Sequence, residues 1–237
     1  MDQTPRPPSN LDEELLDADS PAIFSELDDA ARVLRIQDEL QMGFKAMAHV
    51  GKAVSIFGSA RTPVDHPEYD QARELARRLG RHGFSIITGG GPGAMEAANR
   101  GAKDVGVPSI GLGIELPFEQ SLNPYVDLGL EFHYFFVRKV MFVRYASAFV
   151  VFPGGFGTMD ELFEAATLVQ TEKIRHFPIV LVGTEYWRGL TDWLKDTMTT
   201  EQKISPGDMD LLHVTDDLRE VLLIVEAAEH RRPRSGE

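Results

Sequence analysis

The sequence predicts an α/β fold: a Rossmann-like, doubly wound parallel sheet with helices on both faces, plus an N-terminal helical extension. Two observations predict it. From residue 52 onward, short continuous apolar runs alternate with segments of helical periodicity, and such runs are typical of parallel strands buried on both faces. Two of these runs end in glycine-rich turns that open a helix, at the strand ends where sheets of this kind bind ligands.

The first 20 residues are rich in Pro, Asp and Glu and contain few apolar side chains, so we expect residues 1–20 to be disordered. Ser20 and Pro21 then predict the start of a helix over residues 21–48, with an apolar stripe along one face. Residues 49–230 are predicted to form a single Rossmann-like domain.

Within that domain, we expect strands over residues 53–57, 84–88, 109–114, 149–152 and 179–182. Helical spacing predicts helices over residues 69–81, 94–105, 137–145, 159–171, 187–198 and 215–228, the last capped by Thr215. Residues 115–136 fit this alternation poorly. Their Pro and Gly residues indicate a loop, and residues 132–136 are a candidate for a further strand.

Composition limits the classes of protein to consider. A chain of 237 residues with 43% hydrophobic residues can bury the core of one domain. The absence of cysteine excludes disulfides and thiol nucleophiles and fits a cytoplasmic protein. A net charge of −13 argues against binding nucleic acid, and no apolar run approaches the roughly 20 residues of a membrane span.

The most informative segment covers residues 148–161, where an apolar run ends in Pro153-Gly-Gly-Phe-Gly-Thr-Met-Asp-Glu161. A strand followed by such a turn directs backbone N–H groups and a helix N-terminus at one spot, which suits an anion such as a phosphate. Thr158 and Glu161 also have the spacing of a capping box, a purely structural alternative. Three glycines within four residues favour the anion site, because a capping box does not need them.

Two other strand ends carry small residues. Phe57-Gly-Ser-Ala-Arg61 could bring Ser59 and Arg61 to an anion or a sugar, or could be an ordinary tight turn. The run Gly89-Gly-Gly-Pro-Gly93 matches neither the dinucleotide fingerprint nor a Walker loop, so we expect a mononucleotide or phosphosugar site built from several loops. Glu96 and Asn99 follow it, with an exposed helix start as the structural alternative.

Arg138 and Lys139 open a predicted helix between aromatic and aliphatic residues. Basic side chains at a helix start oppose the helix dipole, and such local misfits tend to mark functional positions. The structural alternative is a solvated ion pair.

Together these motifs resemble the LOG family, the cytokinin riboside 5′-monophosphate phosphoribohydrolases, formerly labelled "lysine decarboxylase-like", in its longer bacterial form. The resemblance covers roughly residues 50–200 and implies hydrolysis of the N-glycosidic bond of an AMP-like nucleotide, giving a free base and ribose 5-phosphate. It implies Arg138 and Glu161 as the catalytic pair. Together with the glycine-rich loops, it predicts as substrate-binding residues Ser59, Gly90, Gly91, Glu96, Glu119, Lys139, Gly154, Gly155, Phe156, Gly157, Thr158, Met159, Asp160 and Thr167.

This chemistry passes through an oxocarbenium-like state that a carboxylate can stabilise, while a gripped phosphate supplies remote binding energy. We therefore expect a nucleoside without phosphate to be a poor substrate, and we expect neither a cofactor nor a metal. The alternatives are a non-catalytic nucleotide-binding module, a nucleosidase of different base specificity, and a pyridoxal-phosphate decarboxylase. The apolar helices of residues 137–172 predict a homodimer or a higher homo-oligomer.

Overall fold

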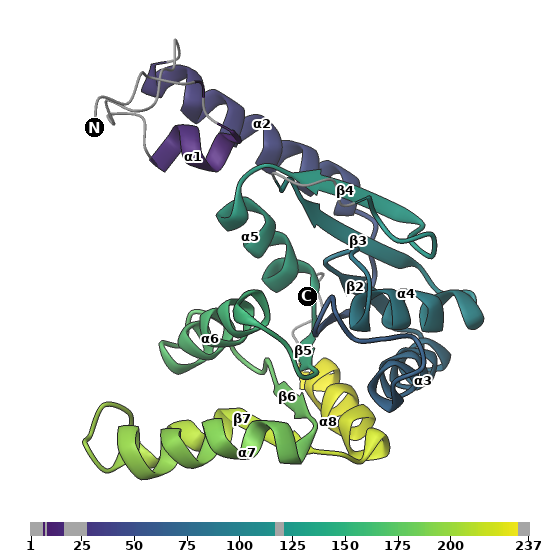
Figure 1. Ribbon diagram of the computed structural model, residues 1–237, viewed down its shortest axis with the longest axis vertical. Helices are drawn as coiled ribbons and strands as arrows, with labels where there is room; N and C mark the ends of the chain where they lie inside the picture. Colours follow the sequence, from purple (N-terminus) through teal and green to yellow (C-terminus); the bar gives the residue numbers. More distant parts are fainter. Residues whose placement is uncertain (1–6, 8, 17–27, 117–120, 232–237) are drawn as a thin grey trace.

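The computed structural model describes residues 7, 9–16, 28–116 and 121–231. They form a parallel sheet of seven strands in the order β4-β3-β2-β1-β5-β6-β7 (Figure 1). The strands are β1 (Ala53–Phe57), β2 (Ser85–Thr88), β3 (Ser109–Ile114), β4 (Leu128–Phe132), β5 (Ala148–Val151), β6 (Ile179–Val182) and β7 (Leu212–Thr215). The predicted doubly wound α/β fold with an N-terminal helical extension is confirmed.

The strand order reverses between β1 and β5. The chain adds β2, β3 and β4 on one side of β1, then returns through a helix to place β5 on the other side. One sheet face is covered by α3 (Pro67–Arg81), α4 (Ala94–Asp104) and α8 (Leu218–Arg231), the other by α5 (Phe135–Tyr145), α6 (Phe156–Gln170) and α7 (Thr184–Trp193). A π-helical turn, η1 (Leu194–Thr199), and a 3₁₀ turn, η2 (Pro206–Leu211), follow α7.

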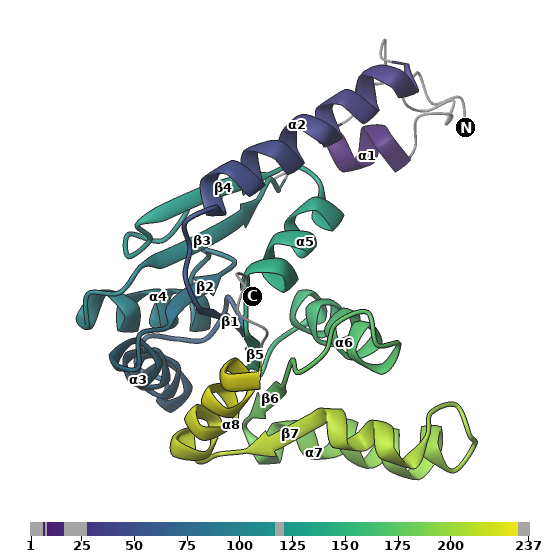
Figure 2. The same cartoon turned by 180° about the vertical axis from the view of Figure 1, so that it is seen from behind.

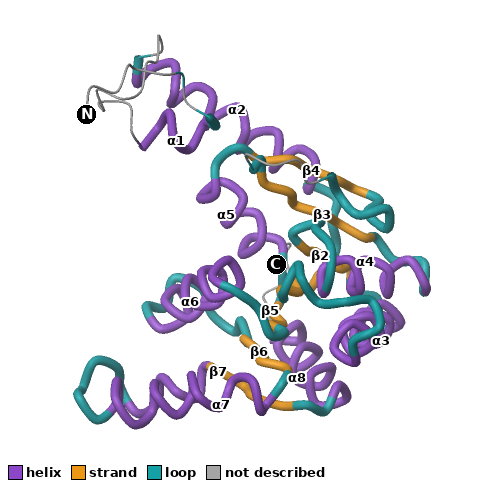
Figure 3. The backbone as a smooth tube through the Cα atoms, in the orientation of Figure 1, coloured by secondary structure: helices purple, strands orange, loops and turns teal. Residues whose placement is uncertain are grey.

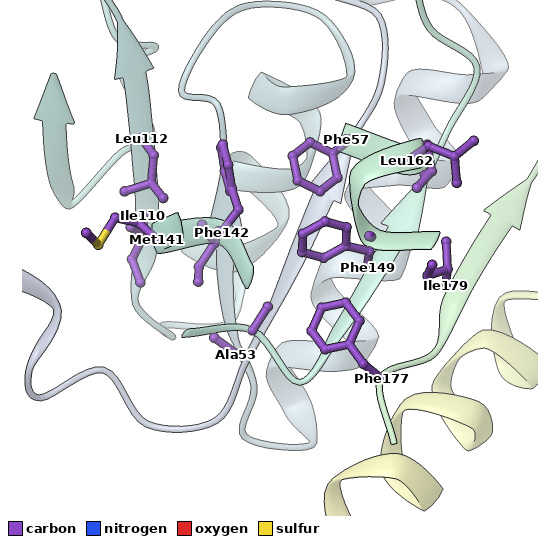
Figure 4. Close-up of a cluster of buried hydrophobic side chains, with 14 of the residues drawn as sticks. Ala53, Phe57, Ile110, Leu112, Met141, Phe142, Phe149, Leu162, Phe177 and Ile179 are labelled. Carbon is purple, nitrogen blue, oxygen red and sulfur yellow. The ribbon is translucent and has the colours of Figure 1, made fainter. Parts of the chain in front are cut away.

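Aromatic rings fill the core between the sheet and α5, as Figure 4 shows. Phe149 of β5 packs edge-to-face against Phe57 and Phe177, with ring centroids 4.7 and 4.9 Å apart. Phe57 also meets Phe142 of α5 at 4.9 Å. Such contacts add about 1 kcal/mol per pair beyond area burial, and the Phe57–Phe142 pair ties α5 to the end of β1.

The N-terminal extension consists of two helices, α1 (Leu11–Leu16) and α2 (Asp29–Met47), and α2 runs beside β4 and α5 (Figure 2). The prediction of disorder for residues 1–20 is wrong for α1, whose Glu14 is buried and lies 2.8 Å from the Arg35 guanidinium. The long helix begins at Asp29, capped by Asp28, rather than near residue 21. Ser20 and Pro21 lie outside the described residues.

Two other predictions need correction. Residues 132–136 do not form a strand of their own, because β4 ends at Phe132 and α5 begins at Phe135. β7 was not predicted, and Thr215 ends that strand rather than capping a helix; α8 begins at Leu218. Among the described residues, no helix is both long and apolar enough to cross a membrane.

Candidate active site

A cavity of about 930 Å³ opens at the carboxyl ends of β1, β2 and β5, where the strand order reverses. This is where ligands bind in open parallel sheets. The loops that follow these strands are drawn in teal in Figure 3. The predicted site residues that line the cavity are Ser59, Arg61, Arg138, Gly154, Gly155, Phe156, Gly157, Thr158 and Glu161.

Main-chain hydrogen bonds hold three loops together around the cavity. The Ser59 N–H donates to the Pro153 carbonyl at 2.9 Å, and the Ser59 carbonyl accepts from the Ala94 N–H at 3.0 Å. The neighbouring Gly58 leaves room for this approach, since a Cβ there would lie 2.6 Å from the Ala94 Cβ. The loops after β1, β2 and β5 therefore form one connected frame.

Helix α6 begins at the glycine-rich turn, with Gly155 as its N-cap residue and no side-chain cap from that residue. Thr158 lies in the first turn, not at the cap, so the capping box considered for Thr158 and Glu161 is not formed. A Cβ at Gly154 would lie 2.1 Å from Thr158 Oγ1, which explains the glycine there. A Cβ on Gly155 or Gly157 would meet no described atom within 4 Å. The N-terminus of α6 is therefore open toward the cavity.

The structure brings Arg138 and Glu161 together. Arg138 Nη2 of α5 lies 3.7 Å from Glu161 Oε1 of α6, and the two side chains are only 12% and 3% exposed. Neither Glu161 carboxylate oxygen accepts a hydrogen bond from a described residue. Burying a carboxylate without such partners costs free energy. The position of Glu161 therefore calls for a functional explanation.

Burial raises the pKa of Glu161 from 4.5 to about 7, against the opposing effect of the Arg138 charge. Burial also lowers the pKa of Arg138, which Glu161 counteracts. The Arg138 guanidinium packs over the rings of Phe135 and Phe142, 5.2 and 5.5 Å from their centroids. A carboxyl group that titrates near neutrality beside a fixed cation suits proton transfer or stabilisation of a cationic transition state.

Four predicted residues from α5 and α6 do not line the cavity. Lys139 Nζ instead binds Asp160 Oδ1 at 2.7 Å and lies 2.9 Å from Glu164 Oε2. Thr167 donates its hydroxyl hydrogen to the Phe163 carbonyl on the exposed side of α6. Met159 is partly buried and packs against the hydrophobic core.

The loop after β2 also departs from the prediction. Asn123 donates its side-chain N–H groups to the carbonyls of Gly90 and Gly91, both at 3.0 Å. Asn99 is fully buried and accepts from Thr88 Oγ1 at 2.6 Å. Gly90, Gly91 and Asn99 therefore belong to a buried polar network that shapes the loop.

Glu96 accepts a hydrogen bond from the Tyr69 hydroxyl at 2.8 Å and does not line the cavity; Gly89 and Met95 do. Glu119 lies outside the described residues.

Sequence reasoning missed several wall residues. Tyr186 follows β6 and donates its hydroxyl hydrogen to the Gly154 carbonyl at 2.7 Å, and the rule that ligands sit at strand ends could have found it. An apolar part of the wall comes from Phe57, Met95, Ile114, Leu116, Phe135 and Phe142. Nothing in the sequence distinguishes these six residues from ordinary apolar residues of the core. Among the described residues, no cluster of three His, Asp or Glu side chains could hold a metal ion.

The family model described as "Possible lysine decarboxylase" matches residues 95–225. The pyrimidine/purine nucleotide 5′-monophosphate nucleosidase of Escherichia coli is 30% identical over 195 residues, which are 73% of this chain and 41% of that protein. The cytokinin riboside 5′-monophosphate phosphoribohydrolase of Mycobacterium tuberculosis is 30% identical over 169 residues, covering 69% of this chain and 88% of that protein.

Solved structures share the fold. The structural-genomics target TM1055 superposes with a TM-score of 0.57 at 24% identity, covering 75% of this chain and 99% of the other. The molybdenum cofactor carrier protein of Chlamydomonas reinhardtii gives 0.56 at 22% identity, covering 77% and 100%. At these identities, the likeness describes the fold alone.

Proposed function

The chain belongs to the LOG family, whose model carries the description "Possible lysine decarboxylase", and we propose that it hydrolyses the N-glycosidic bond of nucleoside 5′-monophosphates. The substrate is AMP or an N6-modified AMP, and the products are the free base and ribose 5-phosphate. The observation that carries the proposal is the buried Arg138–Glu161 pair, whose Nη2 and Oε1 atoms lie 3.7 Å apart beside the open N-terminus of α6.

The phosphate binds at the N-terminus of α6, against Gly154, Gly155, Phe156, Gly157 and Thr158. Backbone N–H groups in the first turn of a helix have no intrahelical acceptor, and the helix dipole favours an anion there. This grip holds the ribose over Glu161, which lies one helical turn further along α6. The energy of phosphate binding is thereby used to place the anomeric carbon.

Glu161 acts as a carboxylate. As the bond from the anomeric carbon to the base breaks, positive charge develops on the sugar, and a carboxylate buried at 3% exposure stabilises it strongly. The same group orients the attacking water and takes up its proton. Arg138 supports the negative charge that develops on the departing base. The proton taken from the attacking water is then passed on to the base nitrogen, which gives the neutral free base and restores the Glu161 carboxylate.

Both named relatives act, by their names, on nucleoside 5′-monophosphates. The chain spans less than half the length of the Escherichia coli relative, so its own substrate range is part of the proposal. A pyridoxal-phosphate decarboxylase is disfavoured, because it needs a lysine aldimine. No described residue that lines the cavity is a lysine, and Lys139 is held by Asp160 and Glu164.

The function is tested by incubating the purified chain with AMP, an N6-prenylated AMP, CMP and UMP, with adenosine as the control lacking phosphate. Free base and ribose 5-phosphate should appear in equal amounts from at least one monophosphate and barely from adenosine. Nucleotide binding without base release would support a non-catalytic module instead. Visible-range absorbance of the purified protein would favour a pyridoxal-phosphate decarboxylase.

The pH dependence of kcat/KM tests the role of Glu161. Because the carboxylate is the active form and its pKa is about 7, kcat/KM should rise with pH through 7 and level off near pH 8. Initial rates of base release between pH 5.5 and 9 measure this profile. A rate that instead falls above pH 7 would make Glu161 a proton donor and contradict the carboxylate role.

We also propose that the protein forms at least a homodimer and acts in the cytoplasm. Phe136 and Val140 of α5 and Phe163 of α6 are large apolar side chains that are 39–45% accessible. Light scattering should give at least twice the chain mass, and Phe136→Glu should shift it toward the monomer. Leu223→Glu, at an exposed apolar residue of α8, is the matched control. A monomeric wild-type mass would contradict this assembly.

We also propose that residues 49–230 form one catalytic, nucleotide-binding domain.

A further inference from the structure

Helix α5 carries Arg138 but begins without a cap of its own. Its N-cap residue is Tyr134, which makes no side-chain cap, and no acidic residue lies in its first turn. Arg138 itself adds a positive charge near the positive end of the helix dipole. The start of α5 therefore needs negative charge and hydrogen-bond acceptors from elsewhere.

Glu39 of α2 supplies them from far away in the sequence. Its Oε1 accepts from the His133 N–H at 2.6 Å and lies 2.9 Å from His133 Nδ1, while its Oε2 accepts from the Tyr134 N–H at 3.2 Å. Glu39 is only 7% exposed. Asp12 of α1 adds a second carboxylate, whose Oδ2 accepts from the Phe135 N–H at 3.4 Å. The Glu39 carboxylate thus fixes His133 and Tyr134, the two residues that precede α5.

The position of Arg138 depends on this fixed start. Its Nε is buried without a hydrogen-bond partner among the described residues, and its guanidinium contacts rings of Phe135 and Phe142. The direction of the side chain is therefore set by the backbone of α5 and by packing. A shift of the first turn of α5 would move Arg138 relative to Glu161.

We propose that Glu39 is a positioning residue: from the N-terminal extension, it holds the first turn of α5 so that Arg138 faces Glu161 in the cavity. This inference rests on the proposed hydrolysis. It gives the N-terminal helices a role in the reaction, since α2 carries the carboxylate and α1 adds a second one.

The test compares Glu39→Ala and Glu39→Gln with Asp38→Ala, an exposed acid on the same helix. Glu39→Ala should lower kcat about tenfold or more with KM changed less than about twofold, because a misplacement of about 1 Å can cost about 10²-fold. Glu39→Gln keeps an acceptor oxygen and should lose less. Asp38→Ala should match the wild type. If Glu39→Ala does not fold, the Gln variant carries the comparison.

A double-variant cycle separates positioning from general stability. In an Arg138→Ala background, Glu39→Ala should lower kcat no further, because the residue it positions is gone. Independent, additive losses, or a loss that only follows the folded fraction, would overturn the proposal.

If the wild type hydrolyses no nucleotide, the proposed function fails, and hydrogen exchange still decides the structural step. Glu39→Ala must then speed exchange in peptides covering residues 133–138, with Asp38→Ala unchanged. Equal exchange in both variants would overturn the role of Glu39.

Discussion

Replacing Glu161 with Gln should lower kcat by about 10³-fold while the affinity for AMP stays measurable, because the amide can neither stabilise a cation nor take up a proton. The side chain keeps its size, so the cavity and the phosphate site at the start of α6 remain. Stopped assays of base release give kcat, and calorimetric titration with AMP gives the affinity.

Glu164→Gln is the matched control. Glu164 lies one turn further along α6, where it pairs with Lys139 and does not line the cavity. Its loss should leave kcat within a few-fold of the wild type. Near-normal turnover by Glu161→Gln would remove Glu161 from the mechanism.

The same substitution should change stability in a pH-dependent way. A folded pKa of about 7 against 4.5 means that the folded chain holds a proton between these values that the unfolded chain releases. The wild type therefore loses stability as pH rises from 4.5 to 7, by up to roughly 3 kcal/mol. Denaturant unfolding should show Glu161→Gln to be more stable than the wild type at pH 8 and nearly equal to it at pH 4.5.

Arg138→Ala should lower kcat by about 10²-fold, the usual cost of losing one preorganised charge partner of the transition state. KM should change little, since the phosphate is held by α6. Arg138→Lys should recover only part of the rate, because a compact ammonium cannot replace the planar guanidinium packed over Phe135 and Phe142.

Arg144→Ala, near the exposed end of the same helix, is the control, since its guanidinium packs over Phe44 away from the cavity. Removing the Arg138 charge should also raise the pKa of Glu161, so the pH profile should move to higher pH. A variant with raised KM, unchanged kcat and an unmoved profile would make Arg138 a binding residue only.

The fold could be predicted largely because buried parallel strands carry their signal in short apolar runs. β1, β3 and β6 have the expected bounds. β7 was missed because it is an edge strand with the sequence LHVT, whose side chains are mostly accessible. The strand proposed over residues 132–136 failed because Phe135 and Phe136 are aromatic residues that begin a helix.

The site was predictable where a motif forces local geometry, and less so where tertiary contacts decide. The glycine-rich turn of residues 153–157 follows a buried strand and precedes a helix, so it places an open helix N-terminus at the carboxyl end of β5. Sequence could not show that Lys139 is paired with Asp160, or that Asn123 satisfies Gly90 and Gly91, since those partners lie 21 to 33 residues away. Likewise, Glu39 lies 95 residues before the backbone it holds.

The bonds that Ser59 makes to Pro153 and Ala94 come from its main chain. The Ser59 side chain has a separate contact, since its Oγ accepts a hydrogen bond from the Arg61 N–H at 3.0 Å. A substitution at position 59 would therefore change the cavity wall and the turn toward Arg61, while the main-chain bonds that join the three loops stay in place.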